Sequence, residues 1–250
     1  MKIDKLLKEY FLYKKNNPLT FLYFFFNKFF SQYFYRKSFS QGSMDLILTQ
    51  IFKNKNYGFY VDVGCQHPIK NNNTYLLFKK GWNGVNIDLD KVNIDLFNFF
   101  RPKDNNVNEA ISDKIEELYL FFYHQKSPIN TLDEKISSKQ RSKIEKKFKI
   151  KTNTLSNVLN KFTIDKVDIL SIDVEGFELK VLKGLDFNKY TPSVIVVEYL
   201  DLKAPKWEIP YNRIDNVLES EIYNFLISKN YNLVNWVNGD LVFVNKNFTN

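Results

Sequence analysis

The pattern of hydrophobic and polar positions changes near residue 57. From there on, short apolar runs alternate with polar or helical segments, a pattern typical of strands and helices around a parallel sheet. The runs VDILSID and SVIVVEYL are almost continuously apolar, as expected for parallel strands covered on both faces. The pattern predicts strands at Phe59–Val63, Gly84–Asp88, Asn106–Ile111, Val167–Ile172 and Val194–Glu198, and helices at Met44–Lys53, Thr74–Lys80, Lys91–Phe100, Leu155–Lys161, Glu178–Leu182 and Arg213–Lys229.

The last part of the chain, YNLVNWVNGDLVFVNKN, holds two β-rich stretches around Asn238 and Gly239. An Asn-Gly pair in this position is a strong β-hairpin signal. An antiparallel hairpin that closes an otherwise parallel sheet is typical of class I methyltransferases, whereas nucleotide-binding dehydrogenases usually end on a parallel strand. We therefore predict an α/β fold: a Rossmann-like, class I methyltransferase-type, three-layer αβα sandwich with a mostly parallel seven-stranded sheet and a C-terminal antiparallel hairpin.

The first residues differ from the rest, because Phe21–Phe30 reads FLYFFFNKFF. This run is shorter than the roughly 20 residues that span a bilayer, and no small-residue cleavage site follows it. We predict an aromatic-rich extension at residues 1–38 and a single domain at residues 39–250. Two interpretations of the extension remain: a helix whose aromatic face packs on the domain, or peripheral membrane contact through residues 19–36.

Composition narrows the classes of partner and compartment. The single cysteine, Cys65, excludes an intrachain disulfide and a cysteine-rich zinc site, and a cytoplasmic protein fits this best. A formal charge of +8 is compatible with anionic partners, but the lysines are scattered or gathered at residues 138–151. Without an aromatic RNA-binding motif or a zinc finger, we expect no nucleic-acid partner. The sequence does not specify an oligomeric state.

The segment FYVDVGCQHP, residues 59–68, predicts a ligand site at the end of a strand. Ligands of open α/β sheets bind outside the carboxyl ends of the strands, and Gly64 lets the backbone approach a ligand closely. Gln66, His67 and Pro68 stand where a GxGxxG fingerprint would need its later glycines. This argues against a nucleotide-sugar dehydrogenase or epimerase. We expect His67 to stabilise the loop by a hydrogen bond.

Acidic residues follow the ends of three predicted strands. Asp88, 24 residues after Gly64, is placed to accept hydrogen bonds from both hydroxyls of a ribose, with Asp90 in reserve; a helix cap is the alternative role. Asp173 and Glu175 alternate with apolar residues and so point into one region, and Glu198 ends the next strand on the same side.

This sequence resembles the FkbM-type methyltransferases in SQGSMDLIL at 40–48, GFYVDVGCQHPIKNNNTYLLFKKGWNGVNID at 58–88, RPKDNNVNEAISD at 101–113, INTLDEK at 129–135 and DILSIDVEGFELKVLKGLDF at 168–187. It departs from the family pattern at Cys65, where Ala is common, and at Met44, where an acidic residue is common. The resemblance implies S-adenosylmethionine as the cofactor, with Asp62, Gly64, Cys65, Asp88, Asn108, Ala110, Ile111 and Asp173 as its binding residues.

The resemblance further implies O-methylation of a sugar or glycan hydroxyl, in a polysaccharide, a lipopolysaccharide or a nucleotide sugar. The hydroxyl must lose its proton, so Asp173, Glu175 and Glu198 are the candidate catalytic residues. Asp173 and Glu198 are also candidate ligands of Mg²⁺, which prefers carboxylate oxygens. The alternative is a catalytically weak Rossmann-fold binding module in a glycan-assembly complex. Residues 112–154 form an irregular insertion that is a candidate for substrate contacts.

Overall fold

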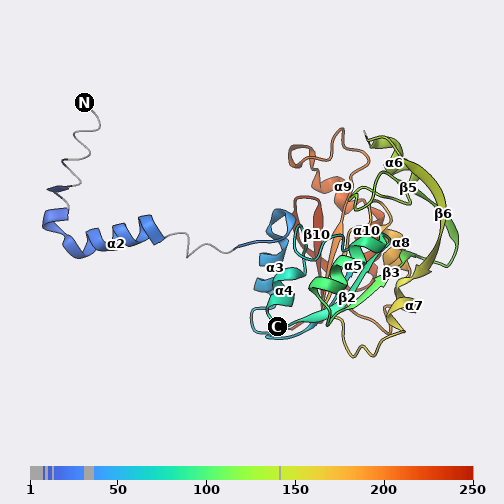
Figure 1. Cartoon of the computed structure of the whole chain (residues 1–250), viewed down its shortest axis with the longest axis horizontal. Helices are drawn as coiled ribbons and strands as arrows, with labels where there is room; N and C mark the ends of the chain where they lie inside the picture. The colour runs from blue at the N-terminus through green and yellow to red at the C-terminus, as the bar shows by residue number, and fades with distance from the viewer. Residues whose placement is uncertain (1–7, 9–10, 13, 31–36, 141, 250) are drawn as a thin grey trace. The chain divides into compact units, whose positions relative to one another are not determined.

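The computed structural model divides the chain into two units, Met1–Lys37 and Ser38–Asn250, one residue from the predicted boundary. The first unit contains helix α2 (Pro18–Phe30), drawn in blue in Figure 1. Part of the predicted membrane segment, residues 31–36, lies outside the described residues. Among those described, no helix is long and apolar enough to cross a membrane. The structure describes residues 8, 11–12, 14–30, 37–140 and 142–249.

A seven-stranded sheet in the order β3-β2-β1-β7-β8-β10-β9 forms the centre of the second unit (Figure 1). The first five strands of this order run parallel to one another, whereas β10 lies antiparallel between β8 and β9. The predicted fold, including the C-terminal hairpin, is confirmed. The strands are β1 (Phe59–Val63), β2 (Asn83–Asp88), β3 (Asn105–Asn108), β7 (Ile169–Ile172), β8 (Val194–Glu198), β9 (Tyr231–Val237) and β10 (Asp240–Asn245).

Helices cover both faces of the sheet. Because successive residues of each strand point to opposite sides, every strand contributes side chains to both helix layers. On β1, Tyr60 packs with Met44 of one helix layer, whereas Val61 packs with Leu155 of the other. Both layers form clusters of buried apolar side chains, which is why the strands read as continuous apolar runs. The first layer holds α3 (Met44–Ile51), α4 (Tyr75–Lys79) and α5 (Lys91–Phe100), and the second holds α7 (Leu155–Leu159), α8 (Glu178–Lys183), α9 (Ile214–Leu218) and α10 (Glu221–Ser228).

Two elements differ from their predicted form. The strand predicted at Asn106–Ile111 is two strands: β3 ends at Asn108, and β4 (Ala110–Ser112) leaves the central sheet to pair with β6 (Lys146–Thr154). The helix predicted at Arg213–Lys229 is α9 followed by α10. The break occurs at Ser220, whose side chain accepts a hydrogen bond from the backbone N–H of Tyr223 and thereby starts a new helix.

The insertion at residues 112–154 contains ordered structure. A second sheet, in the order β4-β6-β5, joins β5 (Glu117–Phe122) to the long strand β6. Helix α6 (Glu134–Lys139) begins at Asp133, whose carboxylate accepts the N–H groups of Lys135 and Ile136. Among the described residues of the second unit, two short helical turns remain, η2 (Gln41–Ser43) and η3 (Ile209–Tyr211).

Candidate active site

Two clefts open at the carboxyl ends of the central strands. Counting the space that is open to solvent, the first cleft measures about 620 Å³ and the second about 1560 Å³. The clefts meet at residues that line both of them: Gly64, Gln66, Pro128, Asp173 and Glu175. Two ligands, one in each cleft, would therefore face each other across Asp173 and Glu175.

Gly64 forms the floor between the clefts, directly after β1. Its φ is +78°, and a Cβ at this position would lie 1.7 Å from the carbonyl oxygen of Asp173. The backbone N–H of Gly64 donates to Ile87 at 2.8 Å, and that of Asp173 donates to Val63 at 3.0 Å. Only glycine therefore allows the ends of β1 and β7 to come this close.

Asp88, at the end of β2, lines the first cleft with a carboxylate that the backbone holds in place. One oxygen accepts the N–H of Gln66 at 2.9 Å and the other accepts the N–H of Asp90 at 2.7 Å. Burial raises the pKa of Asp88 to about 6. The side chain of Asn93 also hydrogen-bonds this carboxylate, and the acceptor positions that remain are the ones open to a ribose hydroxyl. Asn108 donates to the carbonyl of Asp88 at 2.9 Å and fixes this strand end.

Ala110 and Ile111 line the first cleft from β4, beside Leu132 and Phe177. Because β4 bends away from the central sheet, these two residues stand at the side of the cleft instead of extending its floor. The four side chains give this part of the cleft an apolar wall. Such a wall suits a flat ring, such as adenine.

Asp62 and Cys65 are enclosed within the protein. The carboxylate of Asp62 accepts hydrogen bonds from Asn72 at 3.1 Å and Thr74 at 3.0 Å. Cys65 packs against Ile94 and other apolar residues of α5, and burial raises the pKa of its thiol. These contacts hold the loop after β1; that either residue touches a cofactor stays a prediction.

His67 and Asp90 also organise the loops around the first cleft. The ring Nδ1 of His67 accepts the N–H groups of Ile69 and Lys70, both at 3.0 Å, which confirms the expected loop-stabilising hydrogen bond. Asp90 caps α5 with one oxygen, and with the other it accepts the N–H of Lys126 at 2.6 Å. Asp90 thus ties the insertion to the central sheet.

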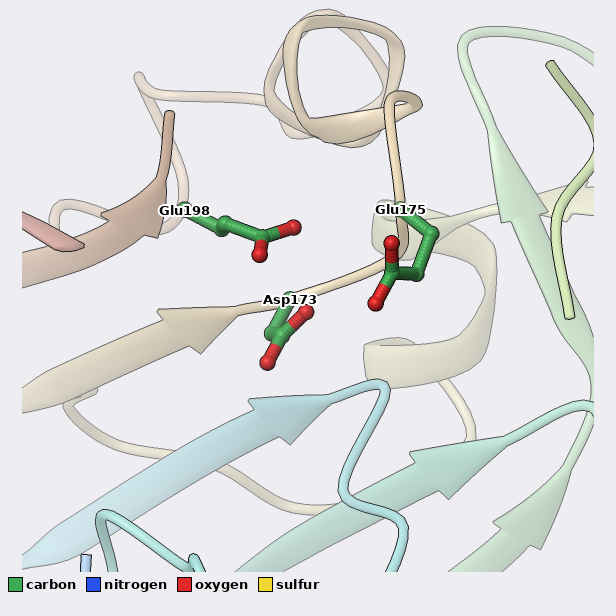
Figure 2. A group of neighbouring side chains, drawn as sticks. All are labelled: Asp173, Glu175 and Glu198. Carbon is green, nitrogen blue, oxygen red and sulfur yellow. The ribbon is translucent and has the colours of Figure 1, made fainter. Parts of the chain in front are cut away.

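Asp173, Glu175 and Glu198 form an acidic cluster at the ends of β7 and β8. Figure 2 shows their carboxylates converging, and one oxygen of each lies within 4.8 Å of the others. Desolvation by the surrounding protein raises the pKa of Asp173 to about 6. Desolvation and the neighbouring carboxylates raise the pKa of Glu175 to about 8, and they also raise the pKa of Glu198. The Oε2 atom of Glu198 is buried and has no hydrogen-bond partner. The strand-end pattern predicted that these three would share one region.

A tight turn at Glu175 and Gly176 orients the carboxylates that follow β7. Glu175 adopts φ +55°, an uncommon value for a residue with a side chain, and Gly176 follows at +103°. Buried Glu178, in the first turn of α8, accepts the N–H groups of Val174 and Gly176, both at 3.0 Å. Thr131 donates to the carbonyl of Glu175 at 2.6 Å. Glu178 and Thr131 were not predicted as site residues, although both stand within segments that resemble the FkbM family.

The roof of the first cleft comes from the insertion and was not predicted in detail. Ser127, Pro128, Asn130 and Leu132 line it. No periodicity marks these residues, and the only sequence signal is the resemblance of the segment INTLDEK. The second cleft is bounded instead by the connection that follows β8 and by the turn between β9 and β10; residues from these parts are Tyr199, Leu200, Asp201, Ala204, Lys206, Trp207, Glu208, Ile209, Asn212, Asn238, Gly239 and Asp240.

Comparison with known proteins identifies the family. The family model described as "Methyltransferase FkbM domain" matches residues 54–233. No curated protein and no solved structure matches the chain significantly. The matched span runs from just before β1 into β9 and includes the floor, the acidic cluster and the roof of the first cleft. The chain is a methyltransferase-family protein with a Rossmann-like fold, and it belongs to the FkbM methyltransferase family.

Proposed function

We propose that this protein transfers a methyl group from S-adenosylmethionine to a hydroxyl of a sugar or glycan. The observation that carries the proposal is the junction of the two clefts at Asp173 and Glu175. A methyl transfer needs a donor and an acceptor aligned across a short gap, with acid–base groups beside it. The first cleft offers a ribose-binding carboxylate and an apolar wall, which suit the cofactor general to the family.

In this arrangement, the chain's residues orient the two ligands and handle one proton. S-adenosylmethionine supplies an activated methyl group when bound. Asp88 accepts hydrogen bonds from the ribose, and Ala110 and Ile111 contact the adenine. At the junction, Asp173 or Glu175 takes the proton of the acceptor hydroxyl. A base is most effective when its pKa lies near the working pH, and values of about 6 and about 8 meet this condition.

A divalent cation is a second way to activate the hydroxyl. Asp173 and Glu198 offer hard oxygen ligands of the kind that Mg²⁺ binds, and one oxygen of each lies within 4.8 Å of the other. The metal would lower the pKa of a coordinated hydroxyl. Full activity in excess EDTA would leave the carboxylates as the base, whereas loss of activity that Mg²⁺ restores would establish the metal.

Calorimetric titration with S-adenosylhomocysteine tests the first cleft. We expect micromolar binding, about −8 kcal/mol, that Asp88→Ala weakens at least tenfold. Asp95→Ala, which removes an exposed carboxylate paired with Lys91, is the matched control and should leave the affinity unchanged. Absence of binding by the intact protein would contradict the proposed cofactor site.

Incubation with labelled S-adenosylmethionine and a panel of glycans tests turnover. Transfer of label to a sugar oxygen, lost in Asp173→Asn, is the expected result. Cofactor binding without transfer to any glycan would favour the other proposal for this fold, a catalytically weak binding module in a glycan-assembly complex.

We also infer that residues 19–36 place the protein at an anionic membrane surface. Residues 1–37 contain eight Lys and Arg but only two Asp and Glu, so they carry +6 of the chain's net +8. On α2, Leu19 is 82 % exposed, and Leu22 and Phe26 are each about half exposed. Apolar side chains beside clustered positive charge suit a membrane interface.

Flotation of the full chain with vesicles tests the membrane proposal. Binding to phosphatidylglycerol-containing vesicles but not to pure phosphatidylcholine is expected, with loss in the combined variant Leu22→Glu and Phe26→Glu. Phe99→Glu, at an exposed aromatic of the second unit, is the control. Equal flotation of the two variants would contradict the role of α2.

A further inference from the structure

The second cleft is lined by many carboxyl groups and few cations. Among the described residues, none of its carboxylates forms an ion pair with a Lys or Arg side chain, although the chain as a whole is basic. Of these carboxylates, Asp201 accepts a hydrogen bond at each of its two oxygens, from the backbone N–H of Lys203 and from the side-chain amide of Asn216. The carboxylates that line the cleft are Asp173, Glu175, Glu198, Asp201, Glu208 and Asp240, against a single ammonium group, that of Lys206.

The acidic cluster has the geometry of an ammonium site. An ammonium group that donates three hydrogen bonds of about 2.9 Å needs acceptors about 4.7 Å apart. One oxygen of each of the three carboxylates lies within 4.8 Å of the others, so a single ammonium group can reach all three. The Oε2 atom of Glu198 is buried and accepts no hydrogen bond, and the carboxyl of Glu198 lies within hydrogen-bonding reach of Asp173. Asp240 adds a fourth carboxyl nearby, whose pKa burial and Asp173 raise to about 7.

The remaining walls suit a sugar. Trp207 is 36 % exposed, and its indole N–H donates to the carbonyl of Asp201 at 3.0 Å, which holds the ring in place. Lys139 Nζ lies over the ring, 6.0 Å from its centroid, and the part of the ring that stays exposed is the surface available to the C–H face of a pyranose. Amide side chains, which both donate and accept hydrogen bonds, line the cleft at Gln41, Gln66, Asn71, Asn73, Gln140, Asn212 and Asn238.

We propose that the second cleft binds a glycan unit that carries a free amino group, with the ammonium in the acidic cluster next to the hydroxyl to be methylated. An ammonium group at this point favours the ionised form of these carboxyls, whereas a phosphate or a uronic acid would meet acidic groups with no cation among them. As a description of the acceptor, this inference depends on the methyltransferase function proposed above. As a statement about binding, it can be tested without turnover.

Calorimetric titration of the full chain, saturated with S-adenosylhomocysteine and kept in EDTA, tests the proposal. The probes are a glucosamine tetramer, its N-acetylated counterpart and a galacturonic acid tetramer. We expect the glucosamine tetramer to bind at least tenfold tighter than the N-acetylated one, and the galacturonic acid tetramer to bind weakest. Glu198→Gln should reduce the affinity for glucosamine to that for the N-acetylated tetramer, whereas Glu145→Gln, at an exposed carboxylate on the insertion, should not.

Three outcomes would overturn the amino-group proposal: equal affinity for the glucosamine and N-acetylated tetramers, tighter binding of the galacturonic acid tetramer, or selectivity that appears only when Mg²⁺ replaces EDTA. The last would assign the cluster to a metal. Failure of the function proposed above is distinguishable, because it appears as loss of S-adenosylhomocysteine binding. In that case, the same titrations on the free protein still measure amine selectivity.

Discussion

The two clefts that meet at the acidic cluster are built from different kinds of structure. The first lies on the ends of β1, β2 and β7, with Gly64 as its floor and Asp88 held by two backbone N–H groups. The second is bounded largely by the long connection after β8 and by the turn of the terminal hairpin. The residues of the first cleft are held in place because they lie at strand ends. The second cleft depends on contacts within a loop, such as the hydrogen bond from Trp207 to Asp201.

This difference predicts which changes damage both clefts and which damage one. A change in the sheet floor or in the turn that carries the cluster should affect both clefts. Changes at Asp88 should affect only the first, and changes in the connection after β8 only the second. The four predictions that follow run from the largest expected effect to the smallest.

Gly64→Ala should abolish binding in both clefts and destabilise the fold. The new Cβ would lie 1.7 Å from the carbonyl of Asp173, so the ends of β1 and β7 must separate. Gly81→Ala is the control: Gly81 also has a positive φ, +94°, but a Cβ there meets no atom within 4 Å. Gly81→Ala should lower the free energy of unfolding only by the backbone strain, about 1–2 kcal/mol. Thermal melts and S-adenosylhomocysteine titrations of both variants measure the difference; similar behaviour would contradict the close approach.

Glu178→Ala should lower methyl transfer about a hundredfold while weakening cofactor binding much less. The substitution leaves the N–H groups of Val174 and Gly176 without their acceptor, and the turn that aims Asp173 and Glu175 loosens. Glu178→Gln retains the accepting oxygen and should restore most of the rate. Because Glu178 acts through the turn, kcat should fall more than KM rises in Glu178→Ala. Equal loss in the Ala and Gln variants would indicate that the charge, not the hydrogen bonds, matters.

Strand-end chemistry could be predicted from the sequence, and loop placement could not. Asp88, Asp173 and Glu198 stand at the ends of apolar runs, and the alternation of side chains along a strand determines which face each occupies. The roof of the first cleft depends instead on contacts such as that between Lys126 and Asp90, which are 36 residues apart. Such pairs leave no periodic pattern in the sequence.

The two misjudged elements have a similar origin. One strand was predicted at Asn106–Ile111, yet the chain turns off the central sheet at Glu109. Glu109 accepts hydrogen bonds from Asn153 and Lys161, which belong to the insertion and the segment after it. Tertiary contacts of this kind override a local strand preference. They also carry Ala110 and Ile111 from the floor of the first cleft to its wall.

The affinity for S-adenosylhomocysteine should fall below pH 6, by about tenfold per pH unit, because of Asp88. Burial raises its pKa to about 6, so the carboxylate gains a proton as the pH falls through this value. The protonated form presents a donor where a ribose hydroxyl needs an acceptor. Asp88→Asn should bind more weakly at pH 7.5 but show no such decline at lower pH. Parallel pH profiles for the two proteins would assign the decline to another group.

Trp207→Ala should raise the KM for the glycan acceptor several-fold and leave S-adenosylhomocysteine affinity unchanged, which makes it the smallest of the four effects. Trp207 lines only the second cleft, and the substitution removes a stacking surface but no charge. Trp207→Phe keeps an aromatic face but loses the hydrogen bond to Asp201, and should therefore recover part of the acceptor affinity. If Trp207→Phe restores no more acceptor affinity than Trp207→Ala, the indole acts through its hydrogen bond, which holds the connection after β8 in place. If the two variants also weaken the cofactor, the clefts are coupled through this loop and not only through the floor.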